Sequence, residues 1–106
     1  MVRPKKCRLV YAEPGADYFK PRAIPLRDLK EVELSVEEFE ALRLTDYEGM
    51  EQKKVAGKMK VSQPTLHRIL SSARKKVAEA LAEGKAIKIH GGAYALSGKK
   101  KKTKKR

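Results

Sequence analysis

Residues 52–69, QKKVAGKMKVSQPTLHRI, decide the fold that the sequence predicts. Val55 and Met59 lie four positions apart, a spacing that puts two side chains on one face of a helix. The apolar spacing breaks at Val61 and restarts at Leu66. Two short periodic runs with a three-residue interruption predict two helices joined by a tight turn. This is the layout of a helix-turn-helix.

The second helix has its own start signals. Ser62 is a good N-cap, and Pro64 falls in the first turn, where a missing N–H costs nothing. We expect Ala56 at the point where the first helix approaches the second closely. An αα-hairpin that only packs is the alternative reading of this pattern. The exposed face of the second helix favours nucleic-acid binding, because it carries side chains of the types that read bases. These are Gln63, Thr65, His67, Arg68 and Ser71.

The charge of the chain is large and unevenly distributed. The 106 residues hold 26 Lys and Arg against 13 Asp and Glu, a formal net charge of +13. Residues 28–51 contain nine acidic and two basic side chains, whereas residues 52–98 contain ten basic and two acidic ones. Both ends of the sequence are basic as well, with seven cations in residues 99–106 alone. A polyanion is the partner that this distribution predicts; solvated surface charge is the plainer alternative.

Other features restrict the class of protein. The single cysteine, Cys7, excludes an internal disulfide and fits a reducing cytoplasm. Because it has no Cys partner and no nearby His, we interpret it as a small buried apolar residue, with a redox or metal-binding thiol as the alternative. No apolar run is long enough to span a membrane. We find no nucleophile–base pair, phosphate loop or metal-ligand spacing. The sequence therefore predicts a cytoplasmic protein that is not an enzyme, with no cofactor and no metal.

Residues 1–33 are expected to form a basic arm and a proline-rich loop packed on the core. Residues 9–11 could form a short strand, and residues 26–29 one helical turn. We expect Tyr18, Phe19 and Ile24 to hold the loop against the core. Stacking of the two aromatic rings on bases is the alternative.

Residues 35–38, SVEE, form a capping box that predicts a helix up to about Tyr47, ended by Gly49. Its expected apolar face has Leu44 at the edge and otherwise consists of Val36, Phe39, Leu42 and Tyr47. Three acidic side chains near the positive end of the helix dipole are expected to be solvated rather than to bind metal. These are Glu37, Glu38 and Glu40.

The helix that begins after the turn should continue over residues 63–82, with Gly84 at its end. Residues 86–90 alternate in polarity, which predicts a short strand that could pair with residues 9–11. Residues 93–106 are expected to be a disordered Lys-rich tail, because like charges repel one another.

Several short motifs follow one another along the chain: RPKKCR at residues 3–8, YFKP at 18–21, IPL at 24–26, EEFEALRL at 37–44 and GKAIKIHGG at 84–92. They resemble the motifs of a small, uncharacterised prokaryotic family of predicted DNA-binding proteins, over about residues 2–92. Residues 34–81 also resemble the promoter-binding helix-turn-helix at the C-terminal end of primary sigma factors. The resemblance implies a sigma-like DNA-binding fold and a regulatory role. In that family the turn usually carries Gly where this chain has Lys60, and the Lys-rich tail is not a family feature.

We therefore predict a mainly α fold: a sigma-like three-helix helix-turn-helix domain at residues 34–92, with a short terminal β element and the disordered basic tail. The expected function is sequence-specific binding of double-stranded DNA in transcriptional regulation. The residues expected to read bases are Gln63, Thr65, His67 and Arg68. Those expected to bind phosphates are Lys53, Lys54, Lys60, Ser71, Arg74 and Lys75.

Two rival functions remain open at this point. The small size and the Lys-rich tail also suit an RNA-binding or ribosome-associated protein, although few aromatic side chains are present to stack on bases. A protein–protein adaptor could use the acidic residues 28–51 against RNA polymerase or another basic surface. The sequence also leaves a homodimer open.

Overall fold

The computed structural model describes residues 8–92 and 94–96. The elements follow one another as β1 (Arg8–Val10), β2 (Tyr18–Phe19), the 3-10 turn η1 (Leu26–Asp28), β3 (Glu31–Leu34), α1 (Val36–Leu42), the π-helical turn η2 (Arg43–Tyr47), α2 (Gln52–Met59), α3 (Gln63–Glu83), β4 (Ala86–Ile89) and β5 (Tyr94–Leu96). The expected basic arm before Arg8, with Cys7, and the tail beyond Leu96 lie outside the described residues.

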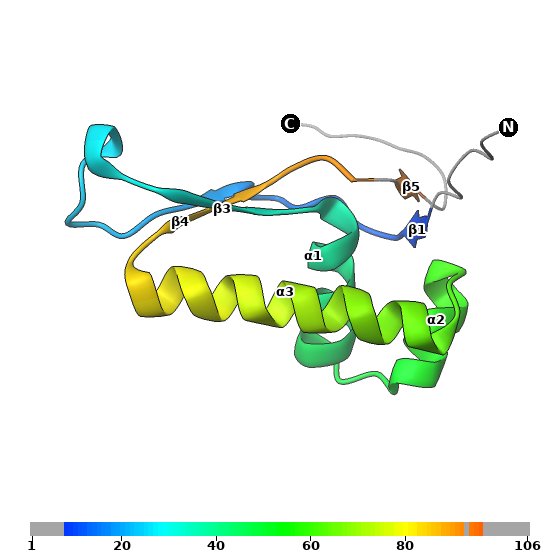
Figure 1. Ribbon diagram of the computed structural model, residues 1–106. Coiled ribbons are helices and arrows are strands. Elements are labelled where there is room, and N and C mark those ends of the chain that lie inside the picture. The colour runs from blue at the N-terminus through cyan, green and yellow to red at the C-terminus, as the bar shows by residue number, and fades with distance from the viewer. Residues whose placement is uncertain (1–7, 93, 97–106) are drawn as a thin grey trace, which may run out of the picture.

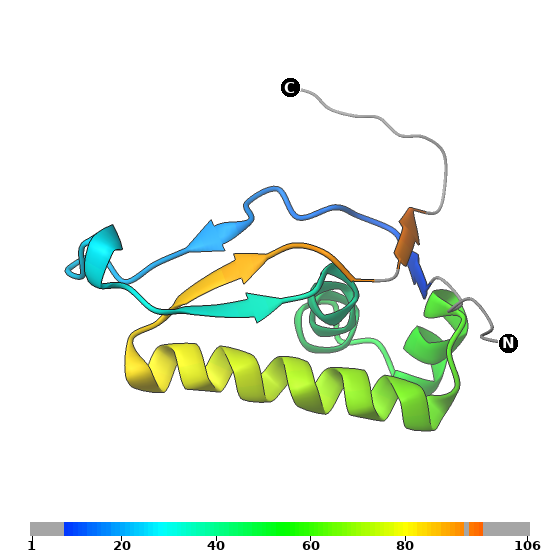
Figure 2. The ribbon, with the colours of Figure 1, turned by 45° about the horizontal axis from the view of Figure 1, so that its top comes forward.

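The long helix α3 is the spine of the molecule. Figures 1 and 2 show the three-stranded sheet along one side of α3, α1 crossing it, and α2 beside its N-terminal end. The expected bounds of α3 are confirmed, since it runs from Gln63 to Glu83 with Gly84 in the left-handed conformation at its end. Ser62 caps it as predicted, because its side chain accepts a hydrogen bond from the Thr65 N–H.

The strands pair differently from the prediction. β4 lies between β3, to which it is parallel, and β2, to which it is antiparallel. β1 pairs instead with β5, so the predicted pairing of residues 86–90 with residues 9–11 is wrong. Parallel pairing needs a long crossover, and the three helices between β3 and β4 supply it.

Three strands were not predicted from the sequence: β2, which lies in the segment expected to be a proline-rich loop, β3 and β5. β3 reads EVEL, and its side chains alternate between exposed and buried, as a strand with one covered face requires. β5 falls inside the segment expected to be a disordered tail, so that expectation is wrong for Tyr94–Leu96. The β content is therefore larger than the single terminal element expected, and it is divided between two small sheets.

The capping box of α1 is confirmed. The Ser35 side chain accepts a hydrogen bond from the Glu38 N–H at 3.1 Å, and the Glu38 carboxylate accepts one from the Ser35 N–H at 2.9 Å. The expected solvation of the acidic side chains is wrong, since Glu38 is 8% exposed and Glu40 is fully buried. Glu37 forms an ion pair with Arg8 at 3.2 Å. The helix lies between β1 and α3, so its polar face is covered as well as its apolar face.

Each buried carboxylate of α1 has partners that compensate its burial. Arg43 donates two hydrogen bonds of 2.9 Å to Glu40, which also accepts one from the Tyr11 N–H at 2.9 Å. Glu38 accepts hydrogen bonds from Ser72 at 2.6 Å and from Lys76 at 2.9 Å. These contacts connect α1 to β1 on one side and to α3 on the other.

The apolar face predicted for residues 36–47 is wrong in its last turn. Tyr47 is 83% exposed, whereas Leu44, expected at the edge, is buried. The cause is η2, in which the Glu48 N–H donates to the Arg43 carbonyl five positions earlier, at 2.8 Å. A turn that is one residue wider changes the direction of every side chain after it.

The core consists of two clusters that share α3. One lies between α1, η2, α2 and the first half of α3, and the other lies under the sheet and includes Val10, Leu34 and Ile89.

In the loop between β1 and β3, Tyr18 and Ile24 are half-buried but Phe19 is 51% exposed, so Phe19 does not hold the loop to the core as expected. The predicted helical turn at residues 26–29 corresponds to η1.

Among the described residues, no helix combines the length and the apolar character needed to cross a membrane.

Candidate nucleic-acid interface

The α2–α3 connection has a defined backbone geometry. Lys60 adopts the left-handed conformation, with φ 61° and ψ 45°, and its N–H donates to the last turn of α2. The Val61 N–H donates to the Ala56 carbonyl at 3.0 Å, which completes the end of the helix. The left-handed backbone conformation favours glycine. Lys60 therefore adopts the conformation expected of the Gly that the family usually has at this position of the turn.

The two helices pack through small and apolar side chains. Ala56 is 3% exposed and belongs to the same buried cluster as Val55, Met59, Leu66 and Leu70. The placement of Ala56 at the contact between the helices is therefore confirmed. Because both helices contribute fully buried side chains, the angle at which α3 leaves the turn is fixed by packing.

The four residues expected to read bases lie in the first two turns of α3. Gln63, His67 and Arg68 are exposed, and Thr65 is half-buried. The Thr65 hydroxyl accepts hydrogen bonds from Ser62 at 2.9 Å and from the Arg68 guanidinium at 3.4 Å. The Arg68 side chain thus lies back along the helix, held by one long and exposed contact that costs little to break.

The six residues expected to bind phosphates divide into two groups. Lys53, Lys54 and Lys60 are exposed at the end of the molecule that α2 and the turn form. The others lie further along α3, where they are also exposed: Ser71, Arg74 and Lys75.

Arg74 already has a protein partner. Its guanidinium donates to both carboxylate oxygens of Asp46 in η2, at 2.7 and 3.1 Å. This hydrogen bonding holds the pKa of Asp46 below its usual value and raises that of Arg74. Both side chains are about half exposed, and such a pair stabilises a fold by only about 0–1 kcal/mol. Arg74 can therefore exchange Asp46 for a phosphate at small cost.

Sequence reasoning missed a contact that fixes β1 beside α2. The Tyr11 hydroxyl donates to the Lys58 carbonyl at 3.0 Å, and the Lys58 ammonium lies 4.3 Å from the centre of the Tyr11 ring. Tyr11 and Lys58 are 47 positions apart, so no local pattern could indicate the pair. The contact places Tyr11, which directly follows β1, next to α2.

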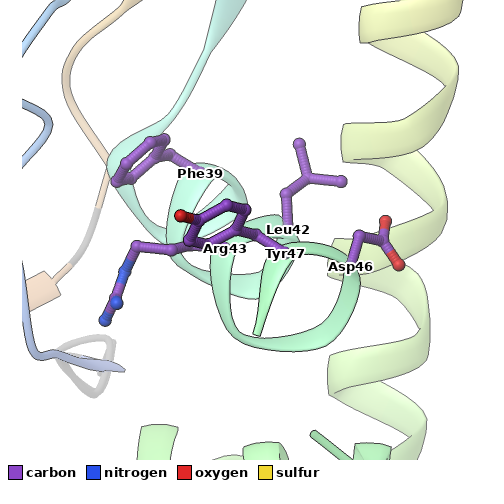
Figure 3. A pocket seen from close by; sticks show the side chains of 5 residues that line it. All are labelled: Phe39, Leu42, Arg43, Asp46 and Tyr47. Carbon is purple, nitrogen blue, oxygen red and sulfur yellow. The ribbon is translucent and has the colours of Figure 1, made fainter. Parts of the chain in front are cut away.

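An open apolar groove of about 570 Å³ lies on α1 and η2, and Figure 3 shows the five side chains that line it. They are Phe39, Leu42, Arg43, Asp46 and Tyr47. From the sequence, none of them was expected to bind a ligand. Three of them, Phe39, Leu42 and Tyr47, were expected on the apolar face of the helix. Among the described residues, no cluster of three or more His, Cys, Asp or Glu side chains could hold a metal ion.

Residues 1–97 match the family described as "Protein of unknown function DUF134". The chain belongs to the DUF134 family. Among its relatives is a UPF0251 protein of Moorella thermoacetica, 59% identical over 100 residues, which are 94% of this chain and 67% of the relative. UPF0251 proteins of Pelotomaculum thermopropionicum and Caldanaerobacter subterraneus are 59% and 56% identical, over 91% and 92% of this chain and 73% and 83% of theirs. No solved structure matches the chain.

Membership of DUF134 confirms the resemblance to a small prokaryotic family over nearly the whole described chain. The family description and the names of these relatives state no activity. The geometry of α2 and α3 is therefore the main guide to the function of this chain.

Proposed function

We propose that this protein binds double-stranded DNA sequence-specifically, through α2 and the first two turns of α3, and acts as a transcriptional regulator. One observation carries the proposal. Leu66 and Ile69 are buried against the core, while Gln63, His67 and Arg68 are exposed in the same two turns. A rigid helix that presents amide, imidazole and guanidinium groups to solvent has the chemistry that reads base edges in the major groove.

Each residue has a proposed role. Arg68 is about 200° around the axis from Leu66, at 100° per residue, so it can point into the groove and bond bidentately to guanine. Gln63, five positions earlier, lies about 140° around the axis from Arg68, exposed in the first turn of α3, and suits adenine. Thr65 and His67 support the readout. The lysines of α2 and the turn bind phosphates and set the register, with Ser71, Arg74 and Lys75 further along the backbone.

The rival functions have less support. An adaptor that uses the acidic residues 28–51 would offer fewer charges than the sequence suggests, because Glu38 and Glu40 are buried and internally bonded. An RNA-stacking surface needs neighbouring exposed rings. Tyr18 and Tyr94 belong to two different sheets, and the Tyr18 hydroxyl is bonded to Glu31 at 2.6 Å.

Selection from a random duplex pool tests the proposal. We expect the wild-type protein to enrich one motif, and Arg68→Ala to alter that motif. Arg27→Ala is the matched control, because it removes another exposed arginine, in η1 at the other end of the molecule. It should enrich the wild-type motif. Enrichment of no motif, or a stronger competition by single-stranded RNA than by duplex DNA, would contradict the proposal.

A further inference from the structure

The end of the molecule opposite α2 carries an apolar groove that the proposed DNA interface does not use. It has a volume of about 260 Å³ and is lined by residues from the end of α3 and from the strands β2 and β4. Apolar side chains supply much of its lining: Phe19, Pro21, Ala80, Leu81 and Ile87. Leu81 is 78% exposed and Phe19 is 51% exposed. Two large apolar side chains beside one groove are the usual sign of a surface that another molecule covers.

The charges around this groove are balanced, in contrast to the rest of the protein. Lys85 forms ion pairs with Glu79 at 2.6 Å and with Glu83 at 3.1 Å. Lys20 also lines the groove, and its ammonium donates to the Pro21 carbonyl at 2.7 Å, so two lysines and two glutamates lie around the groove. The protein carries a net charge of +13, so two copies repel each other when their basic surfaces meet. A surface with equal numbers of positive and negative charges lets two copies approach each other, and it allows lysines of one copy to lie opposite glutamates of the other.

We propose that a second copy of this chain covers the groove, in a two-fold contact in which Leu81 of each copy packs against the groove and Phe19 of the other. A two-fold contact uses the same patch on both copies, so a patch that combines a protruding Leu81 with a recess beside it is self-complementary. A small molecule in the recess would leave the outer face of Leu81 in water. The balanced rim favours a second copy over a strongly charged partner.

This contact leaves α2 and the first turns of α3 free, because they lie at the other end of α3 (Figure 1). Arg68 and Leu81 are thirteen positions apart, about 20 Å along the helix. In an arrangement with the two α3 helices in line, two copies that meet at Leu81 would hold their Arg68 residues about 40 Å apart, near the roughly 34–36 Å between half-sites one helical turn apart. This spacing rests on the proposed function, whereas the dimer itself does not.

Sedimentation equilibrium over a concentration series tests the dimer. We expect the wild-type protein to reach twice the monomer mass, and Leu81→Lys to raise the dimer Kd by about tenfold or more. Leu81→Lys should keep the wild-type melting temperature of the monomer, because the side chain is largely exposed. Tyr47→Lys is the matched control, since it puts the same charge on an equally exposed apolar residue of the other groove, and it should still dimerise. A monomeric wild type, or dissociation by Tyr47→Lys but not by Leu81→Lys, would overturn the proposal.

The DNA arrangement is tested separately, with inverted pairs of the selected motif at different spacings. The wild-type protein should bind pairs best when their centres are about 10 base pairs apart, whereas Leu81→Lys should bind each half-site independently. A dimer that binds pairs equally well at every spacing would refute the end-to-end geometry. A dimer that selects no motif at all would refute the proposed function and leave the dimer contact standing.

Discussion

Arg68 and Lys75 are both exposed cations on α3, and their positions along the helix assign them different tasks. Lys75 lies about 10 Å further along α3, where the helix would have left the groove in the proposed complex. Arg68→Ala should relax the preference at one base-pair position, which corresponds to about 1–3 kcal/mol of discrimination. Lys75→Ala should weaken every sequence nearly equally and lower the salt slope by about one. The measurement is binding of both variants to a panel of single-base operator mutants.

A uniform loss of affinity for Arg68→Ala would assign Arg68 to a phosphate, and the readout would then have to come from Gln63 or His67.

The left-handed backbone of Lys60 predicts an effect on stability that is independent of DNA. Lys60→Gly should raise the free energy of unfolding by about 0.5–1 kcal/mol, because glycine removes the strain, offset in part by the greater entropy of the unfolded chain. The expected rise in Tm is about 3–6 °C. Lys60→Ala is the control: it removes the charge but keeps the strain.

Both Lys60 variants should lower the affinity for DNA to a similar extent, since both lose the proposed phosphate contact, while only the glycine variant should melt at a higher temperature. Equal melting temperatures for the two variants would show that the turn is not strained at this position.

At the level of elements, the contact between α2 and α3 has little spare volume. Ala56→Leu should overpack it and lower the free energy of unfolding by about 1–3 kcal/mol, measured by thermal melting. The neighbouring Gly57 provides the contrast, because a Cβ added there would meet nothing within 4 Å. Gly57→Ala should therefore stabilise the protein by up to about 1 kcal/mol. An unchanged Tm for Ala56→Leu would mean that the two helices can separate without cost.

Glu38 in α1 accepts hydrogen bonds from Ser72 and Lys76 in α3, and this contact predicts that the stability of the protein depends on pH. Burial raises the pKa of Glu38, but hydrogen bonds from Ser72, the Ser35 N–H and Lys76 outweigh it, so the pKa lies below its ordinary value of 4.5. A carboxylate whose pKa is lower in the folded state than in the unfolded state stabilises the protein at any pH above its unfolded-state pKa. This stabilisation is lost as the pH falls through the folded-state pKa. Glu38→Gln should lower the free energy of unfolding by about 1–3 kcal/mol at neutral pH.

The difference between wild type and Glu38→Gln should shrink as the pH falls below about 4.5, in urea titrations at several pH values. The exposed Glu13 provides the control, and Glu13→Gln should follow the wild-type curve. A difference in the free energy of unfolding that stayed constant at every pH would mean that the charge of Glu38 contributes nothing to the contact between α1 and α3.

The elements that the sequence predicted are those whose signals are local. The caps at Ser35 and Ser62 and the end of α3 at Gly84 depend on residues within one helical turn, and the structure has all three. Burial of Glu40 depends on Tyr11, 29 positions away, so spacing along α1 could not reveal it. Tyr47 was misplaced because helical spacing assumes a regular helix, and η2 is not one.

In the candidate site, too, features that depend on local spacing were predicted, whereas contacts between residues far apart in the sequence were not. Helical periodicity placed Gln63, His67 and Arg68 on the exposed face of α3. The same reasoning treated Arg74 as free, because its partner Asp46 lies 28 positions earlier in another element. Pairing of β1 with β5 was unpredictable for the same reason: short strands carry little register information.

At the scale of the whole molecule, the seven cations of residues 99–106 should add affinity for any duplex without choosing a sequence. Deletion of this segment should weaken random and preferred DNA alike and make the salt dependence shallower. Binding to both kinds of duplex over a range of salt concentrations is the measurement. A variant of equal length with Ser at the seven positions should behave like the deletion. Lost sequence preference with an unchanged salt slope would contradict this role.

The β1–β5 pair joins the first and last of the described elements. A ribosome releases β1 early, and its strand partner leaves only after every helix has been made. Contacts between α2 and α3 are close in sequence and can form quickly, whereas the pairing of Arg8 with Tyr94 must close a loop that contains almost the whole domain. We therefore expect closure of this pair to be a late step of folding. Burial of Val10, which is fully covered in the finished molecule, marks its completion.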